Sequence, residues 1–330
     1  MRERYSVGIN QKLLANIILL NKPLKKYLSH ISANTVKFLK ENKILYEIGF
    51  KEPRIKRNNE WWKDHIRRTE QLKAIKEVTL LSEKLGIDIL IVKTFKPFNY
   101  APDDIDVLLI DSNALEDLIN IMTNEYDYFV RKVGTPEVTL RRIVNNTFVD
   151  VDIHTKMGAG PYEYIDKHYL WKRRQKLNFD KFSINIPNPI DELIITAAHS
   201  VMKELQVLLA DLLHLVNFTK HYNVKNAIRT AKKLGLTIPL YILITLVEKI
   251  TKSETIKERP YKKKNPNRDF IRILSNPKTF PCKVHPLLIG LAYKENIKHR
   301  IRNHGIKAIK ELSRIASSKG TGILMRYIGL

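Results

Sequence analysis

Two short stretches decide the fold of this chain: PDDIDVLLI at Pro102–Ile110 and FVDVDIH at Phe148–His154. Each is an apolar run with acidic residues at alternate positions. Because successive side chains of a β-strand point to opposite faces, each run predicts a strand with one carboxylate face and one apolar face. In the first strand, the carboxylate face carries Asp104 and Asp106.

The second strand places Asp150, Asp152 and His154 on one face. If the two strands are neighbours, two or three carboxylates converge at one point. Two unit charges about 4 Å apart repel by roughly 4 kcal/mol at an effective dielectric constant near 20, so such a cluster needs a counterion. Hard oxygen ligands suit Mg²⁺, and the pair of strands therefore predicts a magnesium site.

The composition indicates an ordinary folded protein. A chain of 330 residues has room for two domains with cores of their own, and 44% hydrophobic with 28% charged residues excludes wholesale disorder. Cys282 is the only cysteine, which excludes an intramolecular disulfide and a multi-cysteine zinc site and favours a reducing compartment. No apolar run approaches the roughly 20 residues that span a bilayer, so we expect a cytoplasmic protein without a membrane partner.

The charge balance is strongly basic. The chain has 58 Lys and Arg against 34 Asp and Glu, a net charge of +24. From Thr251 to Leu330 there are 19 basic and 5 acidic residues, including the basic run KERPYKKKNPNR. This excess favours a polyanionic partner, with nucleic acid ahead of an anionic membrane and RNA ahead of DNA. A solvated basic surface without a partner is the alternative.

The first 58 residues predict short helices, at Gln11–Leu20, at Leu24–His30 and from Ser32 or Asn34 onward. Followed by the ribbon YEIGFKEPRIKRNN, they are compatible with a winged helix-turn-helix whose recognition helix is Ser32–Lys40. The wing would present Arg54, Lys56 and Arg57. A helical bundle that only packs on the next domain fits the pattern as well.

The middle of the chain predicts one long helix and a small sheet. After a linker at Asn58 and Asn59, Trp61–Leu85 has helical spacing and ends at Gly86, with Trp61 and Trp62 as packing anchors. The segments that follow are a strand at Asp88–Lys93, the Asp104 strand, a helix at Asn113–Asn124 and strands at Tyr126–Val133, Glu137–Val144 and Phe148–His154. This order predicts a mixed sheet and not a Rossmann repeat, and the chain has no Walker A or GxGxxG motif.

The rest of the chain predicts a helical domain. Met157–Pro161 is interpreted as a Gly-containing loop. Helices are expected from Asp191 through Leu205 and at Val207–Lys220, Ala227–Leu234, Ile238–Ile250 and Ile306–Ser317. The predicted fold class is therefore α+β: a helical segment at residues 1–58, a small mixed-sheet core at 59–186 and a basic all-α domain at 187–330.

The carboxylate pattern resembles the nucleotidyltransferase superfamily of the DNA polymerase beta type. Asp104-Ile105-Asp106 fills the family's Asp-x-Asp pair, and Asp150 or Asp152 its third carboxylate. The closer resemblance is to a poorly characterised group with Lys-Gly before the pair and Asp-x-His on the later strand, matched by Lys93-Thr94 and Asp152-Ile153-His154. A downstream His and Asp on helices complete that pattern, for which His199 and Asp211 are the candidates. The resemblance covers about residues 70 to 220.

The resemblance implies transfer of a nucleoside monophosphate from an NTP, with two Mg²⁺ ions. Asp104 and Asp106 would bridge the ions, Asp152 would complete one of them, and three residues would contact the triphosphate: Lys93, Thr94 and Lys96. The family's Gly-Ser is absent, because Thr94-Phe95 stands in its place. An inactive nucleic-acid-binding module and a glycosyltransferase that uses the Asp-x-Asp are the competing hypotheses.

Overall fold

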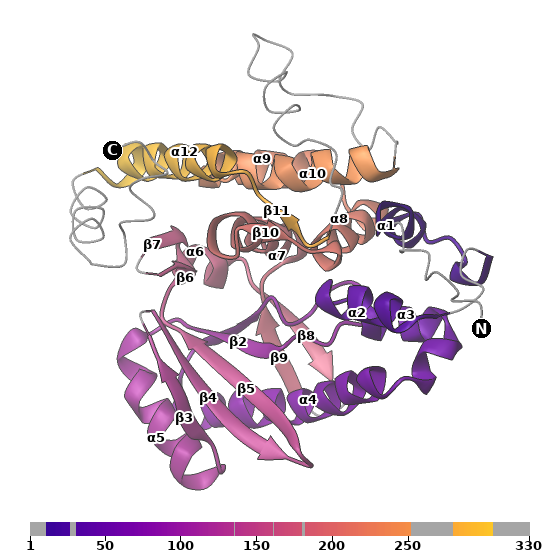
Figure 1. The fold of residues 1–330 in the computed structure, drawn as a ribbon. Coiled ribbons are helices and arrows are strands. Elements are labelled where there is room, and N and C mark those ends of the chain that lie inside the picture. The colour runs from indigo at the N-terminus through magenta and orange to yellow at the C-terminus, as the bar shows by residue number, and fades with distance from the viewer. Residues whose placement is uncertain are drawn as a thin grey trace.

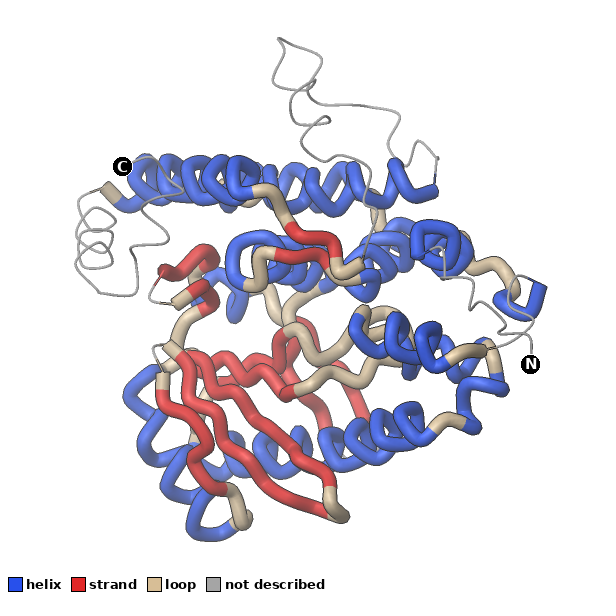
Figure 2. The backbone as a smooth tube through the Cα atoms, viewed as in Figure 1, coloured by secondary structure: helices blue, strands red, loops and turns tan. Residues whose placement is uncertain are grey.

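The computed structural model describes residues 11–26, 31–134, 136–160, 162–179, 182–251 and 280–305. Its fold is α+β, as predicted: a five-stranded mixed sheet lies between helical layers (Figure 1). Three further strand pairs are separate from this sheet, and the helices of the C-terminal half gather on one side of it (Figure 2).

The sheet contains β1 (Ile89–Val92), β2 (Asp104–Leu109), β3 (Phe129–Val133), β4 (Glu137–Val144) and β5 (Thr147–His154). Its strand order is β1-β2-β5-β4-β3. The pair β2 and β5 is parallel, and the other neighbours are antiparallel. The strand-strand-helix-meander order predicted from the sequence is confirmed.

The parallel pair fixes where the carboxylates lie. Its register places Asp104 opposite Asp150, and Asp106 opposite Asp152. The alternate positions form the core on the other face, as the period of two predicts. The buried side chains of that face are Ile105, Val107, Leu109, Val149, Val151 and Ile153.

Two helices cover this apolar face: α4 (Asn59–Leu85) and α5 (Leu115–Glu125), the latter after a short 3₁₀ turn. The long helix is confirmed, and it ends at Gly86 in the left-handed conformation with φ of +67°. The linker predicted at Asn58 and Asn59 is wrong. The Asn58 side chain caps α4 by accepting a first-turn amide hydrogen bond, so the two residues begin the helix.

The N-terminal segment contains α1 (Gln11–Leu19), α2 (Ala33–Glu41) and α3 (Leu45–Lys51). Ser32 caps α2, as predicted. The wing is wrong, because residues 45–57 form α3 and the 3₁₀ helix η2 (Pro53–Arg57), without a strand. Within the element predicted at Leu24–His30, the structure has the 3₁₀ turn η1 (Leu24–Lys26). Residues 27–30 of that predicted element lie outside the described part of the chain.

The C-terminal layer consists of α7 (Pro189–Ala198), α8 (Leu209–His221), α9 (Val224–Leu234), α10 (Thr237–Thr251) and α12 (Pro286–His304). Helix α7 continues as the π-helical turn η4 (His199–Lys203). The predicted all-α character needs one correction, because β10 (Gln206–Val207) pairs with β11 (Cys282–Lys283). The basic run at 257–268 and the helix predicted at 306–317 lie outside the described residues.

Two hairpins were not predicted. Strands β6 (Met157–Ala159) and β7 (Tyr162–Ile165) pair where a loop was expected. A Cβ at Gly158 would collide with the Tyr162 backbone carbonyl, so glycine permits this close pairing. After α6 (Lys167–Lys172), strands β8 (Gln175–Phe179) and β9 (Phe182–Ile186) form the second hairpin.

The second hydrophobic core joins the two ends of the chain. It contains residues of α1, α8, α10 and α12, together with Leu90 and Leu108 from the other face of the sheet. Asn16 Nδ2 donates a hydrogen bond to the Ile250 carbonyl at 2.7 Å. Among the described residues, no helix has the length and apolar character needed to cross a membrane.

Candidate active site

The carboxylates of β2 and β5 line a cavity of about 730 Å³, whose walls also come from the end of α2, from η4 and from the start of α8. Eight of the ten residues predicted for the site line it: Lys93, Lys96, Asp104, Asp106, Asp150, Asp152, His199 and Asp211. The other two, Thr94 and His154, are buried behind them. The structure therefore brings the predicted residues together from five separate segments.

Asp106 is at the centre of this cavity. Its Oδ1 lies 2.8 Å from His154 Nε2 and 2.5 Å from Lys93 Nζ. Burial opposes its ionisation, but Lys93 and the hydrogen bond from His154 hold the pKa of Asp106 well below its usual range. Asp106 is therefore a carboxylate, and His154 donates to it through Nε2.

Asp152 has an oxygen that the protein does not satisfy. Thr139 hydrogen-bonds the carboxylate, but the buried Oδ1 has no partner among the described residues. Burial raises the pKa of Asp152, and the nearby Asp106 raises it further. A buried carboxylate oxygen without a donor is costly, and a cation removes that cost.

Asp104 adds a third acidic group at the entrance. Burial raises its pKa to about 7, and repulsion from Asp106 acts in the same direction. Asp106, Asp152 and His154 each offer one ligand atom, and these atoms lie within 4.8 Å of one another. The donor set is rich in hard oxygen, which fits Mg²⁺. The sequence predicted the oxygen ligands, and the metal itself stays a prediction.

Asp150 is different, although it shares the face of Asp152. Arg141 binds it through two hydrogen bonds, Nε to Oδ1 at 2.6 Å and Nη2 to Oδ2 at 2.7 Å. Arg131 Nη1 contacts the same Oδ2 at 2.7 Å. Both oxygens are thus used by guanidinium groups, which favours Asp152 over Asp150 as the third carboxylate.

Asp211, a predicted site residue on α8, stabilises the wall of the cavity. Asp211 Oδ2 accepts hydrogen bonds from Ser200 Oγ at 2.8 Å and from the Leu208 amide at 3.0 Å, so it caps α8. Its Oδ1 lies 3.6 Å from Lys96 Nζ. Burial lowers the pKa of Lys96, with Asp211 opposing the shift. Lys96 thus faces the cavity with one weak ionic partner.

His199 is a neutral imidazole. Its Nε2 lies 3.2 Å from Glu204 Oε1, and its buried Nδ1 has no partner in the described part of the chain. Burial lowers the pKa of His199 to about 4, and Lys93 contributes to this shift. With Nε2–H directed at Glu204, Nδ1 is free to accept a proton or a hydrogen bond.

Sequence reasoning missed Glu137 and Lys203. Glu137 Oε2 accepts a hydrogen bond from Lys203 Nζ at 2.8 Å and lies 3.6 Å from His154 Nδ1. Although burial opposes it, Lys203 lowers the pKa of Glu137 to about 2. The register places Glu137 directly opposite His154, and an acidic residue at a strand start gives no other signal. The two carboxylates, of Asp106 and Glu137, thus hold the imidazole on both sides.

Glu192 on α7 was also missed. Burial raises its pKa to about 7, while Lys96 and Lys93 oppose the rise. The residue is the fourth of α7 and directly follows Asp191, another first-turn acid. Its acidity alone did not distinguish it from an ordinary first-turn carboxylate.

The segment between β1 and β2 differs from the family pattern. Residues 93–103 contain no helix, so no helix N-terminus faces the cavity there. The Thr94 hydroxyl donates to the Val92 carbonyl at 3.0 Å and accepts from the Asp106 amide at 3.2 Å, so it is occupied within the turn. Six cations line the cavity instead, each within 3.6 Å of a carboxylate oxygen: Lys43, Lys93, Lys96, Arg131, Lys132 and Lys203.

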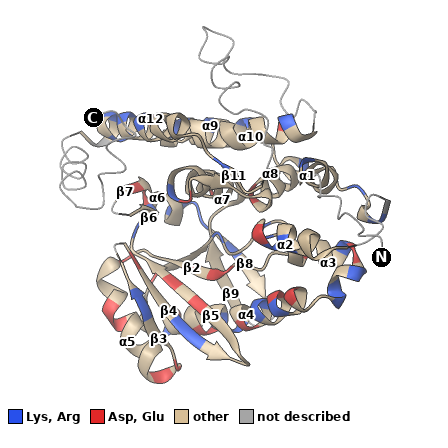
Figure 3. Ribbon diagram, viewed as in Figure 1, with Lys and Arg blue, Asp and Glu red and all other residues tan. Residues whose placement is uncertain are grey.

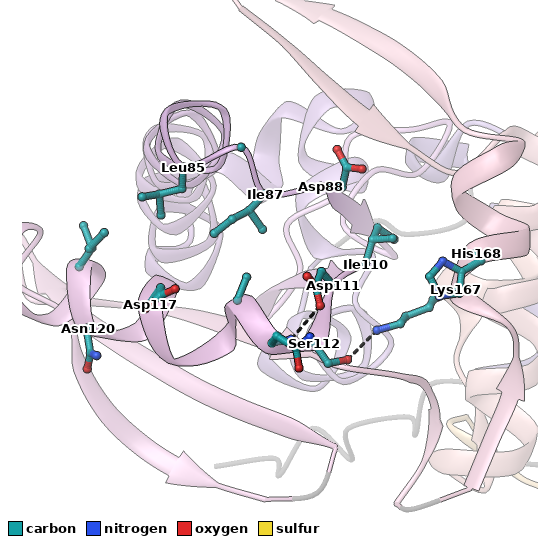
Figure 4. A pocket seen from close by; sticks show the side chains of 14 residues that line it. Leu85, Ile87, Asp88, Ile110, Asp111, Ser112, Asp117, Asn120, Lys167 and His168 are labelled. Carbon is teal, nitrogen blue, oxygen red and sulfur yellow. Dashed lines mark hydrogen bonds between the residues drawn. The ribbon is translucent and has the colours of Figure 1, made fainter.

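A second hollow, of about 940 Å³, lies at the opposite end of β1 and β2 (Figure 4). The Lys167 side chain lines it, and its Nζ donates hydrogen bonds to Ser112 Oγ at 2.6 Å and to the Leu109 carbonyl at 3.2 Å. Asp88, Asp111 and several apolar side chains line the same hollow. It contains none of the residues predicted for the site.

No family model, no curated protein and no solved structure matches this chain. The resemblance to nucleotidyltransferases therefore rests on the residues described above and stays a prediction.

Proposed function

We propose that this protein is a Mg²⁺-dependent nucleotidyltransferase that moves a nucleoside monophosphate from an NTP to a hydroxyl group of an acceptor, with RNA as the acceptor class. One observation carries the proposal. Asp106 and Asp152 lie opposite each other on parallel strands, and a buried oxygen of Asp152 has no partner among the residues that the structure describes. The cavity that they line also contains six cations among nine Asp and Glu side chains, and these cations are the candidate contacts for a triphosphate.

The proposed roles follow from the position of each residue. Asp104, Asp106 and Asp152 hold the metal, which when bound lowers the pKa of the attacking hydroxyl and stabilises the leaving phosphates. His154 keeps Asp106 oriented and ionised through its 2.8 Å hydrogen bond. Lys96, from the segment between β1 and β2, and Lys203, from η4, contact the triphosphate, because each already lines the cavity.

His199 is the candidate proton acceptor. Its imidazole is neutral near pH 7 and offers Nδ1 within the cavity wall, while Glu204 fixes the tautomer through Nε2. A positioned base of this kind accelerates proton removal from a hydroxyl. Asp106 does not supply this step, because it is paired with Lys93 and His154.

The direct test is incubation with each labelled NTP, Mg²⁺ and total RNA. Wild-type protein is expected to transfer label to RNA, and EDTA is expected to abolish the transfer. Asp106→Ala and the double variant Asp104→Ala, Asp106→Ala are expected to be inactive. Label transfer that persists in these variants would refute the assignment.

A second function has two observations in its favour. The Lys93 ammonium lies 2.5 Å from Asp106, where a cation belongs, and no helix N-terminus follows β1. Both features suit an inactive nucleotidyltransferase-like module that binds nucleic acid. This alternative predicts no Mg²⁺-dependent transfer with any NTP and no change in thermal stability on addition of Mg²⁺.

A further inference from the structure

A group of aromatic side chains lies where α3 meets the start of α4. We call it the aromatic platform, and its members are Tyr46, Phe50, Trp61, Trp62 and His65. The rings of Trp61 and His65 are stacked, with centroids 5.2 Å apart and planes 8° apart. Tyr46 stacks on Trp61 at 5.6 Å, and its carbonyl accepts a hydrogen bond from Trp61 Nε1. Trp61 is buried and fixes the group, as the sequence predicted, but the same prediction is wrong for Trp62, whose ring is exposed.

Two members of the platform face the solvent. Trp62 is 49% exposed and Phe50 is 44% exposed. Both rings are held edge-on against Trp61, at centroid distances of 5.2 and 5.7 Å. A large exposed ring on a rigid base offers apolar area at little entropic cost on binding. The platform is therefore a rigid, exposed aromatic surface on which a flat apolar group can stack.

The charges around the platform are not balanced. Residues 37–68 contain ten Lys and Arg and five Asp and Glu, and the two kinds alternate over α2, α3 and the start of α4 (Figure 3). Each of the five acidic residues already has a basic partner; the acidic residues are Glu41, Glu47, Glu52, Glu60 and Asp64. Lys56 and Arg57 have no carboxylate partner among the described residues. Lys56 Nζ lies 4.7 Å from the Phe50 ring centroid and 5.2 Å from that of Trp61.

Ion pairs connect the helix that carries the platform with residues at the candidate active site. Lys43 lines the cavity and pairs with Asp103 at 3.0 Å. Asp103 lies 3.7 Å from Arg67, which in turn binds Asp64 at 2.8 Å. Asp64 directly precedes His65 of the platform. A chain of ionic contacts thus leads from the cavity to Asp64 on the helix that carries Trp61, Trp62 and His65.

We propose that the aromatic platform binds single-stranded nucleic acid, with bases stacked on Trp62 and Phe50 and phosphates held by Lys56 and Arg57. Exposed rings beside unpaired cations are the combination that single strands require, since every unpaired base has a free face to stack. The bases of a duplex are stacked on one another and do not offer these faces. This inference rests on the proposed function in one respect: the strand held here is the acceptor whose end enters the cavity.

The test is fluorescence anisotropy of a labelled single-stranded RNA of 15 nucleotides, without NTP and without Mg²⁺. Trp62→Ala is expected to weaken binding by roughly fivefold or more, the lower end of what loss of one stacked base costs. Lys56→Ala with Arg57→Ala is expected to reduce the salt slope of binding by roughly 1.4, which corresponds to two phosphate contacts on a single strand. Phe129→Ala on β3 is the matched control, because that ring is 46% exposed and distant in sequence from the platform. It is expected to bind RNA like wild type.

Trp62→Phe separates loss of stacking from loss of fold. It keeps an aromatic ring and is expected to bind within about threefold of wild type. Binding by Trp62→Ala that equals that of wild type overturns the proposal. So does a variant that loses affinity for anionic phosphatidylserine vesicles while its RNA binding is unchanged, because the surface is then a membrane contact. Equal affinity for a 15-base-pair duplex and for the single strand overturns it as well.

The design keeps this inference apart from the proposed function. Asp152→Asn removes a proposed metal ligand without touching the platform, and it is expected to bind RNA like wild type. If the wild type binds RNA through Trp62 but transfers no label, the nucleotidyltransferase proposal fails and the platform stands. If transfer proceeds and Trp62→Ala leaves RNA binding and the KM for RNA unchanged, the platform fails alone.

Discussion

The two ends of the β1–β2 pair have very different chemistry. The hollow at the Lys167 end is the larger, about 940 Å³ against about 730 Å³. Yet its ionic groups are exposed acids and one lysine with ordinary hydrogen bonds. The smaller cavity contains Asp104, whose pKa burial raises to about 7, and His199, whose pKa burial lowers to about 4. The candidate active site is therefore distinguished from the other hollow by its buried ionisable groups and not by a larger cavity volume.

The cause of this difference is the direction of the strands. Strands β2 and β5 are parallel, so their carboxylates at alternate positions come into register on one face. At the other end of β2 the chain turns into the 3₁₀ helix η3 (Ser112–Ala114), and the acidic side chains there point to solvent. Asp111, for example, only caps that turn. Substitutions at the two ends should therefore differ in their effects on the unfolding free energy and on label transfer.

The largest difference is expected for Asp106→Ala against Asp88→Ala. Loss of Asp106 leaves the Lys93 ammonium buried without its main partner, which costs roughly 3 to 5 kcal/mol of unfolding free energy. Asp88 is exposed at the larger hollow, and its loss should change stability by less than about 0.5 kcal/mol. Urea denaturation measures both. Equal stability of the two variants would contradict the importance that we assign to the Lys93–Asp106 pair.

Asp152→Asn should separate activity from stability. The asparagine has the shape of the carboxylate, and Asp152 Oδ1 has no donor to lose within the described part of the chain, so the unfolding free energy should stay within about 1 kcal/mol of wild type. Transfer of label should fall by roughly a hundredfold or more, about 3 kcal/mol, because a metal ligand is lost. Asp88→Asn is the control.

Thermal shift with Mg²⁺ reports the same loss without any turnover. The melting temperature of wild type and of Asp88→Asn should rise with added Mg²⁺, and that of Asp152→Asn should not. An Asp152→Asn variant that transfers label at the wild-type rate would remove Asp152 from the site.

The sequence alone predicted most of the carboxylate cavity at the Asp106 end of the strand pair. Alternation alone placed Asp104, Asp106 and Asp152 on one face, because a strand has a strict period of two. It could not identify Glu137, whose contact with His154 depends on the register between β4 and β5, and long-range register is not written in local pattern.

The errors have a similar physical origin. The supposed wing at residues 46–59 contains β-branched and aromatic residues, yet Ile48 and Ile55 are buried at helical spacing and tertiary packing decided the conformation. The hairpin at Met157 was missed because its pairing depends on a glycine that allows close approach, and a lone glycine also suits a loop.

A smaller effect is expected from pH at Asp104. Its pKa of about 7 in the fold lies above the value near 3.9 of an unfolded aspartate, so between these values the folded protein retains a proton that the unfolded chain releases. The stabilisation from this proton is complete below about pH 4 and is lost as pH rises through 7.

Asp104→Asn should therefore equal wild type in unfolding free energy near pH 4 and exceed it at pH 8, by on the order of 1 to 3 kcal/mol in the absence of metal. Urea denaturation at the two pH values measures this difference. The opposite order at pH 8 would mean that the ionised Asp104 is well compensated and is no candidate for a metal ligand. Mg²⁺ at pH 8 should favour wild type over the variant.

The smallest effect is expected at the larger hollow, for Lys167→Met. The substitution keeps the apolar stem and removes two hydrogen bonds, to Ser112 Oγ and to the Leu109 carbonyl. Ser112 is exposed and water can replace the lost donor, so the unfolding free energy should fall by about 0.5 to 1 kcal/mol. Label transfer should be unchanged. Lys93→Met makes the same chemical change at the other end of the strand pair, where the buried Asp106 loses its nearest cation. If Lys167→Met lowers transfer as much as Lys93→Met does, the larger hollow belongs to the functional site and volume was the better guide.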